Sequence, residues 1–268
     1  MNLPGLGTTV VRRMAAGTKA GTKAGSTAGS TAGSTAGSTS IAFPALLGAT
    51  AIAILGTLHF VAYSVPTEAT MGIVQKIFYF HVPAAYGMYL GAAVCFIGSA
   101  GYLARGTRGW DALARGGAEV AVAMGLMVLI SGPLWAAKAW GVYWTWDPRL
   151  TTSLLSVLIY VAYVVLRAFT GDGDAERKFA AALGILGAAN LPIIKYSVQK
   201  WGGNHPKVIS SGGGGLQDPD MKLGLALGFL SFTLLAIVLV WLRARLAMTS
   251  ARLSELSQEA LEVGVDEE

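Results

Sequence analysis

Long apolar stretches separated by short polar segments dominate the chain after Ser40. Six stretches contain no Asp, Glu, Lys or Arg: 41–66, 77–104, 120–137, 150–166, 179–194 and 223–242. A membrane-spanning helix needs roughly 17–25 predominantly apolar residues. The stretches 150–166 and 179–194 are short, but Lys and Arg at their ends can reach back to the membrane surface. The pattern therefore predicts an all-α membrane protein with six transmembrane helices.

The distribution of basic residues predicts how these helices are oriented. Of the 20 Lys and Arg residues, 13 fall on the side that holds the two termini and seven on the other side. Positively charged segments tend to stay in the cytoplasm. Both termini are therefore predicted to be cytoplasmic, with three loops on the outer, periplasmic side.

Outside the helices, the sequence predicts two tails and two charged connections. Residues 1–40 repeat short units of Ala, Gly, Ser and Thr, which predicts a disordered cytoplasmic tail rather than a signal peptide. The six-helix domain spans 41–245, and 246–268 is an acidic cytoplasmic tail that can extend the last helix. The charges within 105–119 and 167–178 are interpreted as solvated faces.

Composition supports a membrane protein. The chain is 53% hydrophobic and 13% charged, against about 25% charged in an ordinary soluble domain. The single cysteine, Cys95, excludes an intramolecular disulfide and any paired-cysteine zinc or haem-attachment motif. No basic cluster interleaved with aromatic residues indicates nucleic-acid binding. No catalytic triad, carboxylate pair or phosphate loop appears, so neither an enzyme nor an ATPase is expected.

Tryptophans gather in the second outer loop, which reads Trp140-Gly141-Val142-Tyr143-Trp144-Thr145-Trp146-Asp147-Pro148-Arg149. Four of the seven tryptophans, counted from Trp135, fall within twelve residues. An aromatic belt at the membrane surface is one explanation. The other is a platform for a large flat ligand whose carboxylates bind Arg149. Composition alone leaves both open.

Two histidines lie on the same side as this loop. His81 stands in Phe78-Tyr79-Phe80-His81-Val82-Pro83, and His205 in Trp201-Gly202-Gly203-Asn204-His205-Pro206. Neutral imidazoles are good ligands for haem iron, and two of them can hold it from opposite faces. His59 lies inside the first helix without such neighbours and is interpreted as structural.

The tryptophan loop resembles the WWD signature of haem-handling proteins. The segments Lys76-Ile77-Phe78-Tyr79-Phe80-His81-Val82-Pro83-Ala84-Ala85 and Pro192-Ile193-Ile194-Lys195-Tyr196-Ser197-Val198 narrow the resemblance. Together, over about residues 41–245, they are similar to haem exporter protein C of the cytochrome c maturation system, the CcmC family. Around His205 the flanking residues and spacing differ from the family pattern, and the repetitive tail before Ser40 is not a family feature.

The resemblance implies a multi-pass protein of the bacterial inner membrane that binds haem b transiently and non-covalently. It implies delivery of this haem to a periplasmic haem chaperone, with transporter subunits driven by ATP and a small membrane protein of the same system as further partners. The haem contacts it implies are Trp140, Gly141, Trp144, Trp146, Asp147 and Arg149, with His81 and His205 as axial iron ligands. Their positive charge and their position on the outer side make Lys138, Lys200 and Lys207 further candidates for binding the haem propionates. Asp147 is expected to cap the following helix, pair with Arg149 or contact the chaperone.

Two other classes of function stay open. A b-type membrane cytochrome transfers electrons through a permanent haem, but its ligand histidines usually lie inside facing helices rather than at one outer edge. A permease subunit without haem would use the tryptophans only as an interfacial belt. The amount and spectrum of bound haem distinguish the three.

Overall fold

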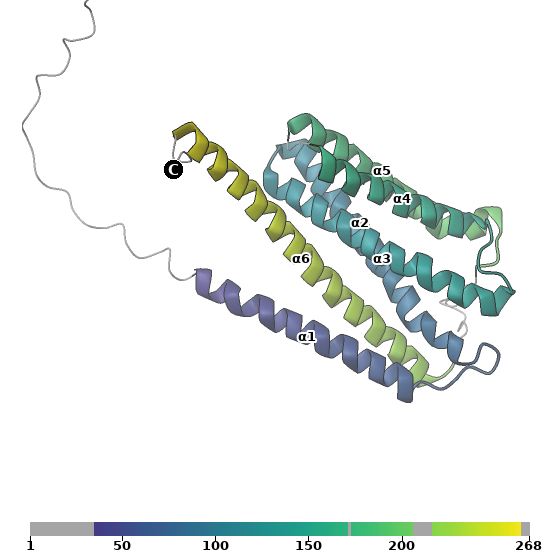
Figure 1. Ribbon diagram of the computed structural model, residues 1–268. Helices are drawn as coiled ribbons and strands as arrows, with labels where there is room; N and C mark the ends of the chain where they lie inside the picture. Colours follow the sequence, from purple (N-terminus) through teal and green to yellow (C-terminus); the bar gives the residue numbers. More distant parts are fainter. Residues whose placement is uncertain (1–34, 171–172, 206–215, 264–268) are drawn as a thin grey trace, which may run out of the picture. The chain divides into compact units, whose positions relative to one another are not determined.

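The computed structural model describes residues 35–170, 173–205 and 216–263 of the 268-residue chain. The elements in these ranges are α1 (Thr35–Tyr63), η1 (Ile73–Ile77), α2 (Phe78–Arg105), α3 (Arg108–Trp140), α4 (Pro148–Phe169), α5 (Asp174–Trp201) and α6 (Pro219–Val263) (Figure 1). Every named element in these ranges is helical, and six helices are long and apolar enough to cross a membrane. The prediction of an all-α protein with six transmembrane helices is therefore confirmed for the described part of the chain.

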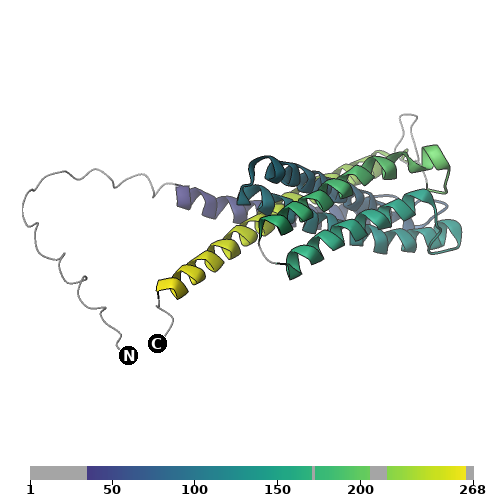
Figure 2. The ribbon, with the colours of Figure 1, turned by 90° about the horizontal axis from the view of Figure 1, so that it is seen from above.

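Residues 42–268 form one compact unit. Within it α2 and α3 are central, because α2 packs against α3, α5 and α6, and α3 also packs against α4 and α6. The helices α4 and α5 pack side by side (Figure 2). The hydroxyls of Thr57 in α1 and Ser231 in α6 are joined by a hydrogen bond of 2.8 Å. Most of the apolar span of α1 is exposed, so this helix offers its side chains to lipid or to another protein.

Small residues allow α2 and α3 to approach closely. A Cβ atom added to Gly91 would lie 2.6 Å from the backbone nitrogen of Ala121, and one added to Gly117 would overlap the backbone of Cys95. Small residues at a helix contact bring the two backbones together and increase van der Waals packing, which drives helix association in membranes. Alanines and two buried tyrosines, Tyr160 and Tyr163, complete this part of the core.

Two helices extend well beyond the charge-free stretches that predicted them. The helix α3 begins at Arg108, twelve residues before residue 120, and α6 continues to Val263. The predicted acidic tail therefore extends the last helix as far as Val263. The helix α1 begins at Thr35, inside the segment expected to be a tail, whose residues 1–34 lie outside the described ranges.

The interpretation of 105–119 and 167–178 as solvated faces is wrong for its key residues. Asp111 in α3 and Arg167 in α4 are only 9% and 4% exposed. Nη2 of Arg167 donates to Oδ2 of Asp111 across 3.0 Å, and Nε of Arg177 in α5 lies 3.4 Å from the same oxygen. A buried charge is costly unless it is paired. Asp111 thus joins α3, α4 and α5 at one end of the bundle.

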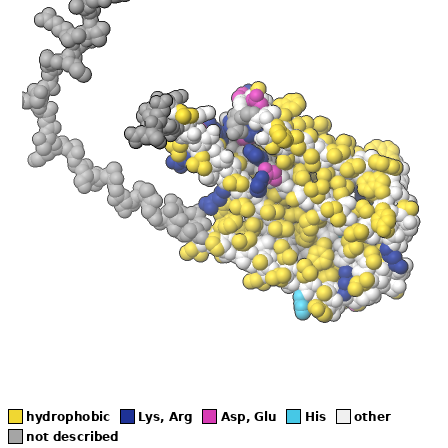
Figure 3. All heavy atoms as spheres, in the orientation of Figure 1, with side chains coloured by type: hydrophobic (Ala, Val, Ile, Leu, Met, Phe, Trp, Pro, Cys, Tyr) yellow, Lys and Arg dark blue, Asp and Glu magenta, His cyan; other side chains and the backbone are white. Residues whose placement is uncertain are grey.

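Hydrophobic side chains cover most of the face in Figure 3, and charged side chains gather toward its ends. This distribution is typical of a bundle embedded in lipid. The six spans alternate in direction, so the beginning of α3 and the ends of α4 and α6 share one end. The connection between α3 and α4 lies at the other (Figure 1).

Candidate functional site

The candidate residues come together where α2 begins and α3 ends. His81 lies in the first turn of α2, and Trp140 is the last residue of α3. Trp144 and Asp147 belong to the connection between α3 and α4, and His205 follows the end of α5. The fold therefore places residues separated by more than a hundred positions at the same end of the bundle (Figure 1).

The tryptophans form two edge-to-face pairs. The rings of Trp135 and Trp140 lie 5.9 Å apart, centre to centre, and those of Trp144 and Trp146 lie 5.8 Å apart. Such arrangements are favourable for aromatic rings. Trp146 is 75% exposed, whereas Trp144 is half-buried. Gly141, with φ of 74°, ends α3 in the left-handed conformation and turns the chain into the loop.

Asp147 has two structural roles at the end of this loop. Oδ1 accepts hydrogen bonds from the backbone N–H groups of Arg149 at 2.7 Å and Leu150 at 3.3 Å, which caps α4. Oδ2 accepts the backbone N–H of Asn204 at 2.8 Å, which ties the tryptophan loop to the segment before His205. A Cβ atom at Gly203 would overlap Oδ2, so this approach requires glycine.

Arg149 makes a second link between the same two segments. Its guanidinium donates from Nη1 to Nδ1 of His205 at 3.2 Å and from Nη2 to the backbone oxygen of Lys195 at 3.0 Å. Of the alternatives expected for Asp147, the helix cap is confirmed. The contact of Asp147 with Arg149 is made to the backbone, while the side chain of Arg149 extends to α5 and to His205.

His81 is held by α3. Its Nδ1 lies 2.9 Å from Oγ of Ser131, and that hydroxyl donates to the backbone oxygen of Met127 at 2.5 Å. A Cβ atom at Gly132 would lie only 3.2 Å from Cε1 of His81, so α3 fits closely around the ring. The rings of His81 and His205 are near enough to interact electrostatically. His59, by contrast, is exposed and lies against Tyr63.

Three buried polar atoms of this loop have no hydrogen-bond partner among the described residues. They are Nε1 of Trp144, Oγ1 of Thr145 and Nε of Arg149. An unpaired buried donor costs roughly 1–3 kcal/mol. Each can donate a hydrogen bond, so together they suit an anionic or carbonyl oxygen of a ligand.

The remaining basic candidates are less well placed. Lys138 and Lys200 are exposed, and Lys207 lies outside the described residues. Lys195 takes part only through its backbone oxygen, which Arg149 binds. Arg149 is thus the one predicted basic residue for which the described structure shows a contact to a candidate iron ligand.

The connection between α1 and α2 closes the same end of the bundle. Oε1 of Gln75 accepts the indole N–H of Trp135 at 3.1 Å. Glu68 closes a tight turn by accepting the backbone N–H groups of Met71 and Thr70, and these bonds hold the pKa of its carboxyl below the usual range. Nζ of Lys76 donates to the backbone oxygen of Ala62 at 2.7 Å. These bonds fix the start of α2, which carries His81.

Sequence reasoning missed four residues of the site: Ser131, Asn204, Gln75 and Thr145. Ser131 and Gln75 are single polar residues in apolar surroundings, and nothing in the sequence pairs them with His81 or Trp135. Asn204 acts through its backbone, which no side-chain pattern reveals. Thr145 lies between two tryptophans, and its position in the loop was the only available signal.

The chain is similar in sequence to known proteins of one family. The chain is 34% identical over 197 residues to heme exporter protein C of Bradyrhizobium diazoefficiens, covering 73% of this chain and 74% of the relative. It is 33% identical over 187 residues to heme exporter protein C of Escherichia coli K12, covering 67% and 73%. The Rhodobacter capsulatus protein of the same name is 28% identical over 222 residues, covering 80% and 90%.

The family model described as heme exporter protein C matches residues 29–259, which include all six helices except the last four residues of α6. The six apolar helices and the bacterial relatives make the chain a multi-pass inner-membrane protein. It belongs to the heme exporter protein C family.

Proposed function

We propose that this protein binds haem at the periplasmic face of the inner membrane and helps to deliver it to a periplasmic haem chaperone for c-type cytochrome biogenesis. Family membership supports a role in haem export. The observation that carries the proposal is that buried atoms of Trp144, Thr145 and Arg149 have no hydrogen-bond partner among the described residues, at the end of the bundle where α2 begins with His81 and Arg149 contacts His205. They offer hydrogen bonds to a haem carboxylate next to two imidazoles that suit iron.

Each candidate residue has a role in this proposal. His81 and His205 supply the axial nitrogens. Trp140, Gly141, Trp144 and Trp146 form the platform for the porphyrin, and Arg149 binds a propionate. Asp147 positions the loop and the His205 segment. The haem is haem b and is bound non-covalently. A thioether bond to the chain is not expected, because the only cysteine, Cys95, is fully buried in the core far along α2 from His81.

In this proposal the protein holds haem and passes it to the chaperone, and it does not catalyse a reaction. Both candidate ligands lie at one end of the bundle, which does not suit electron transfer across the bilayer. The ATP-driven subunits and the small membrane protein of the maturation system are the proposed partners. With the tryptophan loop outside, the end that carries Asp111 and both termini faces the cytoplasm, in agreement with the excess of Lys and Arg on that side.

Absorption spectroscopy of the purified protein tests the proposal. A hand-off protein carries less than one haem per chain, and an added apo-chaperone removes it. A b-type cytochrome keeps a full complement of haem that the chaperone does not remove, and a permease subunit shows no Soret band. Either of the last two results would overturn the proposal.

A further inference from the structure

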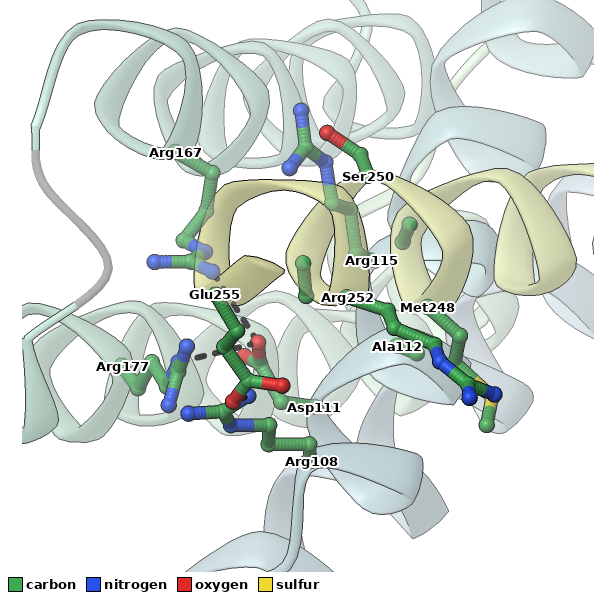
Figure 4. Close-up of a pocket in the computed structure, with 12 residues that line it drawn as sticks. Arg108, Asp111, Ala112, Arg115, Arg167, Arg177, Met248, Ser250, Arg252 and Glu255 are labelled. Atoms are coloured by element: carbon green, nitrogen blue, oxygen red, sulfur yellow. Dashed lines mark hydrogen bonds and ion pairs between the residues drawn. The ribbon is translucent and has the colours of Figure 1, made fainter. Parts of the chain in front are cut away.

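An arginine-lined pocket lies at the end of the bundle opposite the tryptophan loop. It has a volume of about 280 Å³ and lies between the beginnings of α3 and α5, the end of α4 and the C-terminal part of α6 (Figure 4). Its charged lining residues are Arg108, Asp111, Arg115, Arg167, Arg177, Arg252 and Glu255. None of them belongs to the site described above.

The pocket has a strong excess of positive charge. Among the lining residues that the structure describes, five arginines face two carboxylates, which gives these seven residues a net charge of +3. Arg167 and Arg177 point toward Asp111, and Arg108 pairs with Glu255 (Figure 4). Nε of Arg115 lies 3.4 Å from Glu119, a carboxylate that also binds Arg243 of α6. These ion pairs hold the arginines in place around the pocket.

The pocket also has an apolar side. Ala112, Ala247 and Met248 contribute to its wall. A second hollow of about 260 Å³ adjoins it and shares Arg108, Arg177, Ala251 and Glu255. On α6, from the end of the apolar stretch 223–242 toward the lining residues, Leu242 and Leu246 are exposed, 45% and 53% respectively. A cationic pocket therefore lies beside α6 just past the end of its apolar stretch.

We propose that this pocket binds the phosphate group of an anionic phospholipid, with the acyl chains along α6. The guanidinium group matches phosphate oxygens with paired hydrogen bonds. Basic pockets between transmembrane helices typically bind anionic headgroups. A free phosphate compound has the same chemistry, but the exposed leucines favour a lipid. The proposal does not depend on haem binding.

Native mass spectrometry of the full-length protein in detergent tests this proposal. We expect the protein to retain phosphatidylglycerol in preference to phosphatidylcholine. The double variant Arg115→Gln/Arg252→Gln should lower retention about tenfold or more, because each basic residue near an anionic headgroup contributes substantially to binding. Both residues are outside the buried Asp111 cluster, so the variant should still fold.

Two further variants make the test specific. Arg245→Gln removes a positive charge from the same part of α6, where Arg245 stacks on Trp241 and does not line the pocket, and should leave retention unchanged. Glu255→Gln frees Arg108 from its partner and should increase retention. Equal retention in Arg115→Gln/Arg252→Gln and Arg245→Gln would overturn the proposal. Binding of inorganic phosphate or a nucleotide without retention of phosphatidylglycerol would overturn the lipid assignment and indicate a free phosphate ligand.

Discussion

Nη1 of Arg149 donates a hydrogen bond to Nδ1 of His205 across 3.2 Å. A guanidinium group has only donors, so the lone pair of His205 is on Nδ1 and its proton is on Nε2. The opposite holds for His81. The Ser131 hydroxyl donates to Met127, so it accepts from Nδ1 of His81, and Nε2 of His81 carries the lone pair. His81 thus presents a nitrogen ready to bind iron, whereas the lone pair of His205 is engaged by Arg149.

Replacing Arg149 with Gln is expected to weaken haem binding. The variant loses a charged partner for a propionate, and a hydrogen bond to a charged group contributes roughly 1.5–3 kcal/mol. The dissociation constant should therefore rise about tenfold to a hundredfold, measured by haem titration at the Soret band. Lys138→Gln is the matched control, because Lys138 is exposed near the same loop. An unchanged affinity in Arg149→Gln would exclude Arg149 as a propionate partner.

Two substitutions separate the two roles of Asp147. Asn at this position keeps one acceptor oxygen for the cap of α4 but loses the second, which accepts the N–H of Asn204. Asp147→Asn should therefore keep the melting temperature and reduce the six-coordinate haem fraction, because the His205 segment is released. Asp147→Ala also loses the cap, which costs about 1 kcal/mol, and should melt at a lower temperature. If both variants bind haem like the wild type, the hydrogen bond between Asn204 and Asp147 has no role in iron ligation.

The sequence predicted the six helices well, because lipid requires long stretches without charge. It could not predict where α3 begins or where α6 ends. Arg108 pairs with Glu255 and Arg243 with Glu119, so the charged parts of these helices continue together past the apolar spans. Such partners come from distant positions, and a charge pattern read along one chain does not reveal them. The burial of Asp111 was missed for the same reason.

At the site, it was predictable that the candidate residues lie at one end of the helix bundle, but their contacts were not predictable. The cap by Asp147 followed from its position before Pro148, since Asp is a preferred residue there. Its bond to Asn204 depends on how α4 and α5 pack, as does the approach of Arg149 to His205. Tertiary packing, rather than any local pattern, sets these distances.

Labelling of single cysteines tests the orientation of the bundle. Thr67 lies in the connection before α2 and Ala175 at the start of α5, and both are exposed. Thr67→Cys should react with a membrane-impermeant maleimide in intact cells, and Ala175→Cys only after the membrane is opened. The native Cys95 is fully buried and should not react with the maleimide, so the label reports only on the introduced cysteine. The reverse pattern would place the tryptophan loop in the cytoplasm.

Loss of a loop tryptophan should reduce haem content without changing the iron ligands. Burying a large aromatic side chain contributes about 1.5–3 kcal/mol, so Trp144→Ala should lower haem occupancy about tenfold when haem is limiting. The residual haem should keep a two-histidine spectrum. Trp241→Ala is the control, because Trp241 packs against Phe43 away from the site. If both variants lose haem equally, the loss reflects folding and not the platform.

Removing each histidine separately tests the ligation itself. Both His81→Ala and His205→Ala should lose the six-coordinate low-spin spectrum, and added imidazole should restore it, because the missing ligand is an imidazole nitrogen. The asymmetry of the two rings predicts a difference in haem affinity. His81 is held by Ser131 with Nε2 available, so its loss should weaken haem binding more than loss of His205, which must first leave Arg149.

The controls for ligation are His59→Ala and Ser131→Ala. His59 is exposed on α1 and should change neither spectrum nor affinity. Ser131→Ala removes the partner of Nδ1 without removing the ligand, and loss of such an outer partner typically costs 10–100-fold in metal affinity. We expect it to weaken binding while the spectrum stays six-coordinate. Unchanged spectrum and haem content in both His81→Ala and His205→Ala would reduce the tryptophan loop to an interfacial belt, because the remaining histidine, His59, is exposed on α1 and lies against Tyr63.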